Sequence, residues 1–403
     1  MPAGSIEKMK YAYYWGADAC YLGLVDFSLR ALRKGELIDE NNLKTAVDIA
    51  NSLNKKVYCT LNIFAYDSDI EKLYSVLDVI KEAKPHALII SDFGILRIVK
   101  KYLPDIDIHI STQTNILNSE AVKFWRDFGA KRVILARELS LKKIEKIRRE
   151  VPDIELEIFV HGAQCMAYSG RCLLSDYMTK GERQANQGNC AQACRWSYKL
   201  LEETRPNEYF EIIQDDKGSH IMSTKDLCLV KYVKEISNLG IDSIKVEGRT
   251  KSLYYVSCVA KAYRKVLDNI WDSEFAFQEL KKAGNRGYTE GFFFDDNNSQ
   301  SYSYDISKGL AGADFLGIFL EKKESNTYKL LIKNKIMLND EIEIITPNYS
   351  TLAKVKKIIS VKNGEQDRAN TNDEIYIEFE CDNSDWEQEY NCALARTKGM
   401  KEV

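Results

Sequence analysis

Apolar and polar positions alternate in a repeating order of strand and helix along the first two thirds of the chain. Seven strands are predicted from short, continuously apolar runs at 17–23, 56–62, 86–91, 106–112, 132–137, 156–162 and 242–249. Runs of this kind are typical of strands buried on both faces of a parallel sheet. Segments between them, such as 69–84 and 118–129, carry apolar residues three and four positions apart, which predicts amphipathic helices.

This alternation predicts an α/β fold, a (β/α)8 TIM-like barrel over residues 1–305. The eighth strand would precede the first helix, where little chain is present, so we expect the first barrel strand to be missing or truncated. An insertion at about 163–230 interrupts the rhythm before the last strand. From 310 to 403 the alternation of strand and helix gives way to short strands joined by turns, which predicts a small antiparallel β-barrel domain.

Active sites of such barrels lie at the carboxyl ends of the strands. Arg137, Lys245 and Arg249 fall there and predict a site for an anion, because arginine binds carboxylates and phosphates bidentately. An equally open alternative is that the arginines pair with nearby glutamates. His161 is a candidate general base, or a scaffold residue. The other polar candidates, which either contact substrate or cap helices, are Asn62, Asp92, Thr112, Gln113 and Glu247.

Composition and charge limit the partners and the cellular compartment in which this chemistry would take place. The chain of 403 residues has a formal net charge of -3, so any contact with nucleic acid depends on a local basic patch. Lysines 322, 323, 354, 356 and 357 are one such patch, or simply a solvated face. No apolar run is long enough for a membrane span, and the start lacks the apolar core of a signal peptide. A cytoplasmic location is therefore expected, where cysteines serve metals or catalysis more often than disulfides.

Cysteines gather in and near the insertion. The five candidates for a four-ligand site are Cys165, Cys172, Cys190, Cys194 and Cys228. Such sets bind zinc or an iron–sulfur cluster, and ordinary buried cysteines are the third alternative. The spacing differs from the paired knuckles of structural zinc sites, which favours iron–sulfur and leaves zinc as the less favoured metal. Ser197 stands where a radical enzyme motif would need its third cysteine, which argues against that class.

Long motifs in the chain resemble those of the collagenase-like peptidase family. They are "VHGAQCMAYSGRCLLSDYMT", "NCAQACRW", "MSTKDLCL", "IKVEGRTKSLYYV" and "NRGYTEGFF". The resemblance covers nearly the whole chain and is greatest to the branch of tRNA 5-hydroxyuridine synthases. It implies an enzyme that hydroxylates the wobble uridine of tRNA and uses prephenate, a dicarboxylate that would suit the cationic mouth of the barrel.

The same resemblance implies a 4Fe-4S cluster held by Cys165, Cys172, Cys190 and Cys228, with Cys194 as the rival for either of the last two places. The expected partners are tRNA and the small anionic co-substrate, without a membrane, and a homo-oligomer or a paralogous partner stays open. The alternatives are a collagenase-like peptidase, which would need a thiol together with His161, and hydroxylation of rRNA or of a quinone precursor. A non-catalytic protein with a structural cluster is a further alternative.

Overall fold

The computed structural model describes residues 1–24, 27–28, 40–165, 167, 172–195, 213–215, 218–220, 224–248, 251–294, 310–324, 326–360 and 364–398. The chain forms two compact units, which we call the sheet unit and the tail unit. The sheet unit holds residues 1–13, 18–251 and 285–309. The tail unit holds residues 14–17, 252–284 and 310–403, so it includes two helices besides the tail domain predicted at 310–403.

The sheet unit is built on parallel strands, and all seven predicted apolar runs form strands. They are β1 (Ala19–Gly23), β2 (Lys56–Leu61), β3 (Ala87–Ile90), β4 (Ile108–Ile110), β5 (Arg132–Ile134), β6 (Glu155–Ala163) and β10 (Ser243–Val246). They pair in the order β1-β2-β3-β4-β5-β6, and β10 also pairs with β6. The four residues of β3 are all buried, as expected of a strand covered on both faces.

Residues before β1 replace part of the eighth strand that the barrel prediction required. Pro2 forms a parallel bridge with Tyr21, and the amide of Ala3 donates to the carbonyl of Tyr21. The first residues therefore run beside β1, while a closed ring of eight strands stays a prediction.

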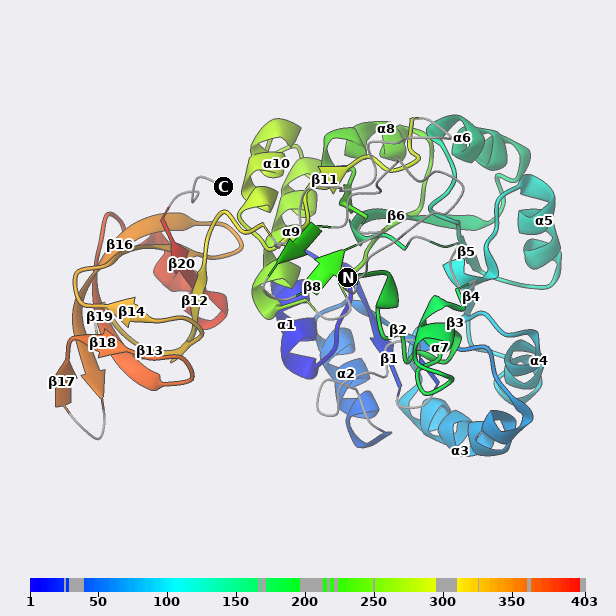
Figure 1. The fold of residues 1–403 in the computed structure, drawn as a ribbon, viewed down its shortest axis with the longest axis horizontal. Helices are drawn as coiled ribbons and strands as arrows, with labels where there is room; N and C mark the ends of the chain where they lie inside the picture. Colours follow the sequence, from blue (N-terminus) through cyan, green and yellow to red (C-terminus); the bar gives the residue numbers. More distant parts are fainter. Residues whose placement is uncertain are drawn as a thin grey trace. The chain divides into compact units, whose positions relative to one another are not determined.

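Helices alternate with these strands as the apolar periodicity predicts. They are α1 (Ile6–Tyr14), α2 (Glu40–Ser52), α3 (Asp67–Ala83), α4 (Phe93–Tyr102), α5 (Ser119–Asp127), α6 (Leu141–Glu150) and α8 (Val233–Asn238). Figure 1 shows α3 to α6 on the outer side of the strands that they connect. Asn118 caps α5 by accepting a hydrogen bond from the amide of Ala121, which fixes where that helix begins.

The elements described in the insertion between β6 and β10 are short. They are α7 (Leu174–Met178), η2 (Ala185–Gln187), η3 (Ala193–Arg195), β7 (Ile213–Asp215), β8 (Gly218–His220), β9 (Asp226–Cys228) and η4 (Val230–Tyr232). β9 pairs antiparallel with the end of β6, and β11 (Tyr288–Thr289) pairs parallel with β9. The insertion is thus attached to the sheet at the carboxyl end of β6.

The tail unit contains a closed antiparallel β-barrel of six strands, as predicted. The strands, in their order around the ring, are β15 (Glu341–Ile345), β20 (Leu394–Thr397), β12 (Phe315–Glu324), β13 (Thr327–Ile332), β19 (Glu374–Cys381) and β16 (Ser350–Ser360). Pairing of β16 with β15 closes the ring. Short additions are β14 (Ile336–Met337), β17 (Gly364–Gln366), β18 (Arg368–Ala369) and η6 (Asp385–Cys392).

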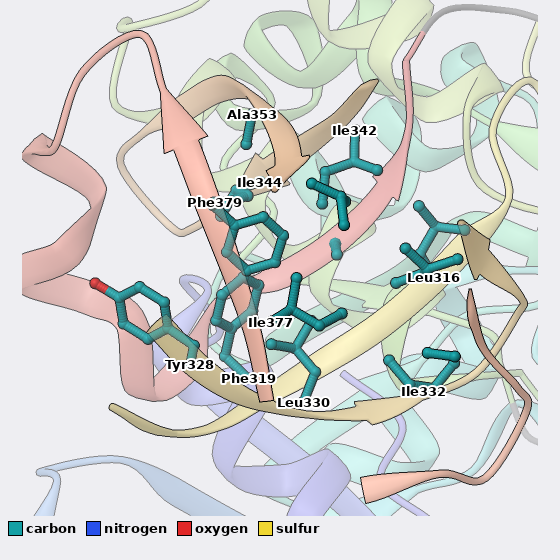
Figure 2. Close-up of a cluster of buried hydrophobic side chains, with 14 of the residues drawn as sticks. Leu316, Phe319, Tyr328, Leu330, Ile332, Ile342, Ile344, Ala353, Ile377 and Phe379 are labelled. Carbon is teal, nitrogen blue, oxygen red and sulfur yellow. The ribbon is translucent and has the colours of Figure 1, made fainter. Parts of the chain in front are cut away.

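The interior of this barrel is filled by side chains that alternate along its strands. Phe319, Tyr328, Ile377 and Phe379 point into one cluster (Figure 2), and the first six residues of β16 alternate between exposed and buried. Helices α9 (Leu253–Leu267) and α10 (Ser273–Lys281) belong to the same unit. In the described part of the chain, no helix is both long enough and apolar enough to cross a lipid bilayer.

Candidate functional site

The end of β6 is where three strands carrying candidate residues meet. Residues 157–161 of β6 pair with β10, and residues 161–163 pair with β9. Gly162 lies at this change of partner with a φ of 101°, a conformation that residues with a side chain rarely adopt. The candidate site is therefore a junction of β6, β9 and β10 at the carboxyl edge of the sheet.

Asp226 is the central carboxylate of this junction, and sequence reasoning did not select it. Its side chain is buried, with Arg286 Nε 3.0 Å from Oδ1 and Lys251 Nζ 3.5 Å from Oδ2. Burial alone would raise the pKa of Asp226, but Arg286 and Lys251 hold it below its ordinary value. The sequence did contain a signal that could have pointed to Asp226. It stands two residues before Cys228 and therefore lies on the same face of the strand.

His161 lies beside this carboxylate and opposite Cys228 in the β6–β9 ladder. Its side chain is almost fully buried, and its ring centroid is 5.3 Å from that of Tyr288. Burial lowers the pKa of His161 to about 3, so the imidazole is neutral at pH 7 and a weak base. These properties agree better with the scaffold alternative than with a general base.

The buried imidazoles predict a dependence of stability on pH. Burial also lowers the pKa of His109 to about 3, so unfolded chains bind protons below pH 6.5 that folded chains do not. Each histidine should therefore lower the free energy of unfolding by about 1.4 kcal/mol at pH 5.5 relative to pH 8. Urea unfolding at pH 5.5 and pH 8 measures this drop in the free energy of unfolding. In His161→Gln and in His109→Gln the drop should be smaller than in wild type by about 1.4 kcal/mol. An unchanged pH slope in both variants would contradict the prediction.

Arg137 lies near the same junction, and its surroundings bear out part of the pairing alternative. Its guanidinium carbon is 3.8 Å from the ring centroid of Phe159, and its Nη2 is 4.0 Å from Glu247 Oε2. The amide of Glu247 donates to the carbonyl of His161, which fixes that residue beside β6. A separation of 4.0 Å makes this contact an ion pair without a hydrogen bond between these two atoms. Arg249 lies outside the described residues.

Lys245 was predicted to face an anionic ligand, but its ammonium group already meets a carboxylate. Its Nζ is 2.7 Å from Glu157 Oε1 and 4.0 Å from the ring centroid of Tyr21. Arg132 also pairs with Glu157, at 2.9 Å. Glu157 is 3% exposed, and Lys245 and Arg132 hold its pKa well below its ordinary value although burial would raise it. This buried triad balances the charge of Lys245 within the sheet.

The remaining substrate candidates divide between structural and open roles. Asp92 Oδ1 accepts from the amide of Ile95 at 2.9 Å, so this carboxylate caps α4. Thr112 is buried and donates to the carbonyl of Leu135. The contact of Asp92 follows the helix-cap alternative, whereas Thr112 bonds a backbone carbonyl just after β5 and caps no helix by this bond. Contact with substrate stays a prediction for these residues and for Asn62. The buried Oε1 of Gln113 has no hydrogen-bond partner among the described residues, which leaves it able to accept from a ligand.

The five candidate cysteines come from segments attached to the same edge of the sheet. Cys165 follows β6 by two residues, and Thr224 Oγ1 donates to the carbonyl of Gln164, which brings the neighbourhoods of Cys165 and Cys228 together. The side chain of Gln187, between the other cysteines, donates to the carbonyl of Phe64 just after β2. All ten cysteines are described, and none forms a disulfide.

The thiols fit an iron–sulfur cluster by donor chemistry, since thiolates are its usual ligands. Cys165 is exposed, Cys172, Cys190 and Cys194 are half-buried, and Cys228 is buried. Among the described residues, no three cysteine, histidine or acidic side chains lie close enough together to hold a metal ion. The ligand set stays a prediction.

Comparisons with known proteins match both units. The family model described as Peptidase family U32 matches residues 4–303, and its C-terminal domain model matches residues 312–388. The tRNA hydroxylation protein P of Haemophilus influenzae is 39% identical over 91% of this chain and 90% of its own length. The protein of that name in Escherichia coli K12 is 38% identical, over 86% and 85%. The 23S rRNA 5-hydroxycytidine C2501 synthase of Escherichia coli K12 is 33% identical, over 77% of this chain and 46% of its own length.

Proposed function

The chain belongs to peptidase family U32, and we propose that it is a tRNA-modifying enzyme that replaces the C5 hydrogen of the wobble uridine with a hydroxyl group. The observation that carries this proposal is the match to the tRNA hydroxylation protein P of Haemophilus influenzae along 91% of the chain, through both units. The match to an rRNA hydroxycytidine synthase covers only 46% of that protein's length. tRNA is therefore the favoured substrate, and rRNA or a quinone precursor is the alternative.

The proposal includes a 4Fe-4S cluster bound by Cys165, Cys172, Cys190 and Cys228. When bound, such a cluster supplies electron-transfer chemistry beside the junction of β6, β9 and β10. Arg137 would bind a carboxylate of prephenate, because its guanidinium lies over the ring of Phe159 near the carboxyl edge of the sheet and presents a planar pair of donors. Asp226 and His161 would hold the strands of the junction in place, since both are buried there.

A peptidase is the second candidate, because His161 lies opposite Cys228 in the ladder. A cysteine peptidase needs a thiol that reaches a peptide carbonyl and a base able to take its proton. The two residues are only 1% and 5% exposed, and burial makes the imidazole a weak base. These properties argue against proteolysis by this pair.

Two measurements test the proposed function. Protein purified without oxygen should be brown and contain about four irons per chain, whereas a colourless, zinc-loaded protein would contradict the cluster. Nucleosides of tRNA from a deletion strain should lack 5-hydroxyuridine when any redundant paralogue is also deleted. Unchanged hydroxyuridine in that strain would overturn the proposed substrate and leave the cluster unaffected.

Arg137→Lys should raise the KM for prephenate about tenfold and leave the KM for tRNA unchanged. Lysine keeps the charge but loses the planar pair of donors and the packing on Phe159, and a charge-assisted hydrogen bond contributes about 1.5–3 kcal/mol. Steady-state hydroxylation of a tRNA substrate would measure both constants. Arg126→Lys on α5, where the arginine pairs with Asp153, is the matched control. Equal KM values for prephenate in the two variants would remove Arg137 from the site.

A further inference from the structure

The tail unit contains a pocket that the proposed chemistry does not use. The pocket holds about 90 Å³ and is lined by Trp15, Trp271 and Phe275 together with Lys261 and strands β15 and β20 of the barrel. One water needs about 10–15 Å³ in a cavity of this kind, so the pocket can admit a group of several heavy atoms. A single six-membered ring is of this size.

Aromatic faces and one ammonium group set the chemistry of the pocket. Lys261 Nζ lies 5.7 Å from the ring centroid of Trp15 and 5.3 Å from that of Trp271. It donates to the carbonyls of Thr346 at 2.7 Å and Tyr349 at 3.4 Å and pairs with no carboxylate of the described residues. An ammonium has three protons, so one donor is left for an acceptor on a bound ring.

The charged residues of the lining balance one another. Arg396 Nη2 is 2.7 Å from Glu279 Oε2 and 2.8 Å from Glu343 Oε1. With Lys261, the lining carries two cations and two carboxylates, and Lys282, which does not line the pocket, also pairs with Glu279 and Glu343. The pocket therefore suits a neutral ring whose edge offers both acceptors and donors, because an ion would meet charges of both signs.

Three of the five lysines of the predicted patch on the tail barrel pair with carboxylates. Lys322 pairs with Glu387, Lys357 pairs with Glu378, and Lys356 pairs with Glu380. These pairs reduce the positive charge that the predicted lysine patch can offer to phosphates. Recognition of RNA by this unit would thus depend on contacts with bases more than on phosphates.

We infer that this pocket binds one unpaired pyrimidine base of the RNA substrate, stacked on Phe275 with Lys261 donating to a base oxygen. Trp271 contacts Phe275 edge to face, with 4.9 Å between the ring centroids, and so holds that ring in place. The inference rests on the proposed function, because it takes the ligand to be part of the modified RNA. Single-stranded bases are commonly recognised by stacking on aromatic side chains with hydrogen bonds to their edges. Phe275 is 47% exposed, which places an aromatic ring at the entrance.

The test measures binding of an unmodified tRNA to the full chain and to Phe275→Ala, with Phe277→Ala as the control. Phe277 is on the same helix but does not line the pocket. Loss of one base stack should weaken binding about tenfold in Phe275→Ala, with Phe277→Ala unchanged. Uridine should also quench tryptophan fluorescence of the full chain, whereas inorganic phosphate should not.

Equal affinities of the two variants, or no quenching by uridine, would overturn the inference. If hydroxyuridine is lost in the deletion strain while Phe275→Ala binds tRNA normally, only the pocket assignment fails. If the unaltered chain binds no tRNA and deletion leaves hydroxyuridine unchanged, the proposed function itself fails.

Discussion

Replacing Cys228 with serine should give a protein without iron and a strain whose tRNA lacks 5-hydroxyuridine. Serine is nearly the same size, so the buried position in β9 should keep its fold, but its hydroxyl is a far poorer ligand for iron than a thiolate. The expected loss is complete, from about four irons per chain to less than one. Iron content after anaerobic purification and nucleoside analysis of a complemented deletion strain measure the two effects.

Cys194→Ser is the second variant needed, because Cys194 is the alternative ligand in the predicted set. If Cys190 and Cys228 complete the site, Cys194→Ser keeps its iron and its activity, and so does Cys381→Ser in the tail barrel. Loss of iron in Cys194→Ser with retention in Cys228→Ser would exchange the two residues in the ligand set. Four irons in both variants and in Cys165→Ser would remove the cluster from this segment of the chain.

The strands could be predicted from sequence because parallel strands buried on both faces leave continuous apolar runs. All seven runs are strands of the sheet unit, and the change to alternating residues after 310 marks the tail barrel. The place of α9 and α10 could not be predicted in this way. Their grouping with the tail unit depends on tertiary contacts such as Lys261 to the carbonyl of Thr346, which join positions 85 residues apart.

The site was less predictable because a polar residue at the end of a strand has several possible partners. Asp92 and Thr112 satisfy nearby backbone groups, which the sequence could not distinguish from contact with a substrate. Asp226 and Glu157 escaped attention because each stands in a mainly apolar run, and the cations that they pair with come from distant segments. Pairing across a sheet, not local pattern, decides which carboxylates are buried.

Glu157→Gln should lower the free energy of unfolding by about 3–5 kcal/mol, because it leaves Lys245 and Arg132 buried without their shared carboxylate. Urea unfolding followed by circular dichroism measures the loss. Glu155→Gln is the matched control, since Glu155 also pairs with Arg132 but its side chain is 30% exposed, and it should cost about 1 kcal/mol or less. A loss below 1 kcal/mol in Glu157→Gln would contradict a stabilising role for the triad.

The mechanism of this loss can be separated from a general packing defect in two ways. Lys245 and Arg132 hold the pKa of Glu157 below its unfolded value, so the stabilisation is present above that unfolded value and is lost as pH falls through the folded one. The difference in free energy of unfolding between wild type and Glu157→Gln should therefore begin to narrow below the unfolded pKa and continue to narrow until pH falls below the folded one. Arg132 still pairs with Glu155 in Glu157→Gln, so Lys245 is the buried cation that loses most. Adding Lys245→Met removes that cation, and the double variant should therefore be more stable than Glu157→Gln alone. A double variant that is less stable would show that Lys245 contributes through packing on Tyr21 and not through its charge.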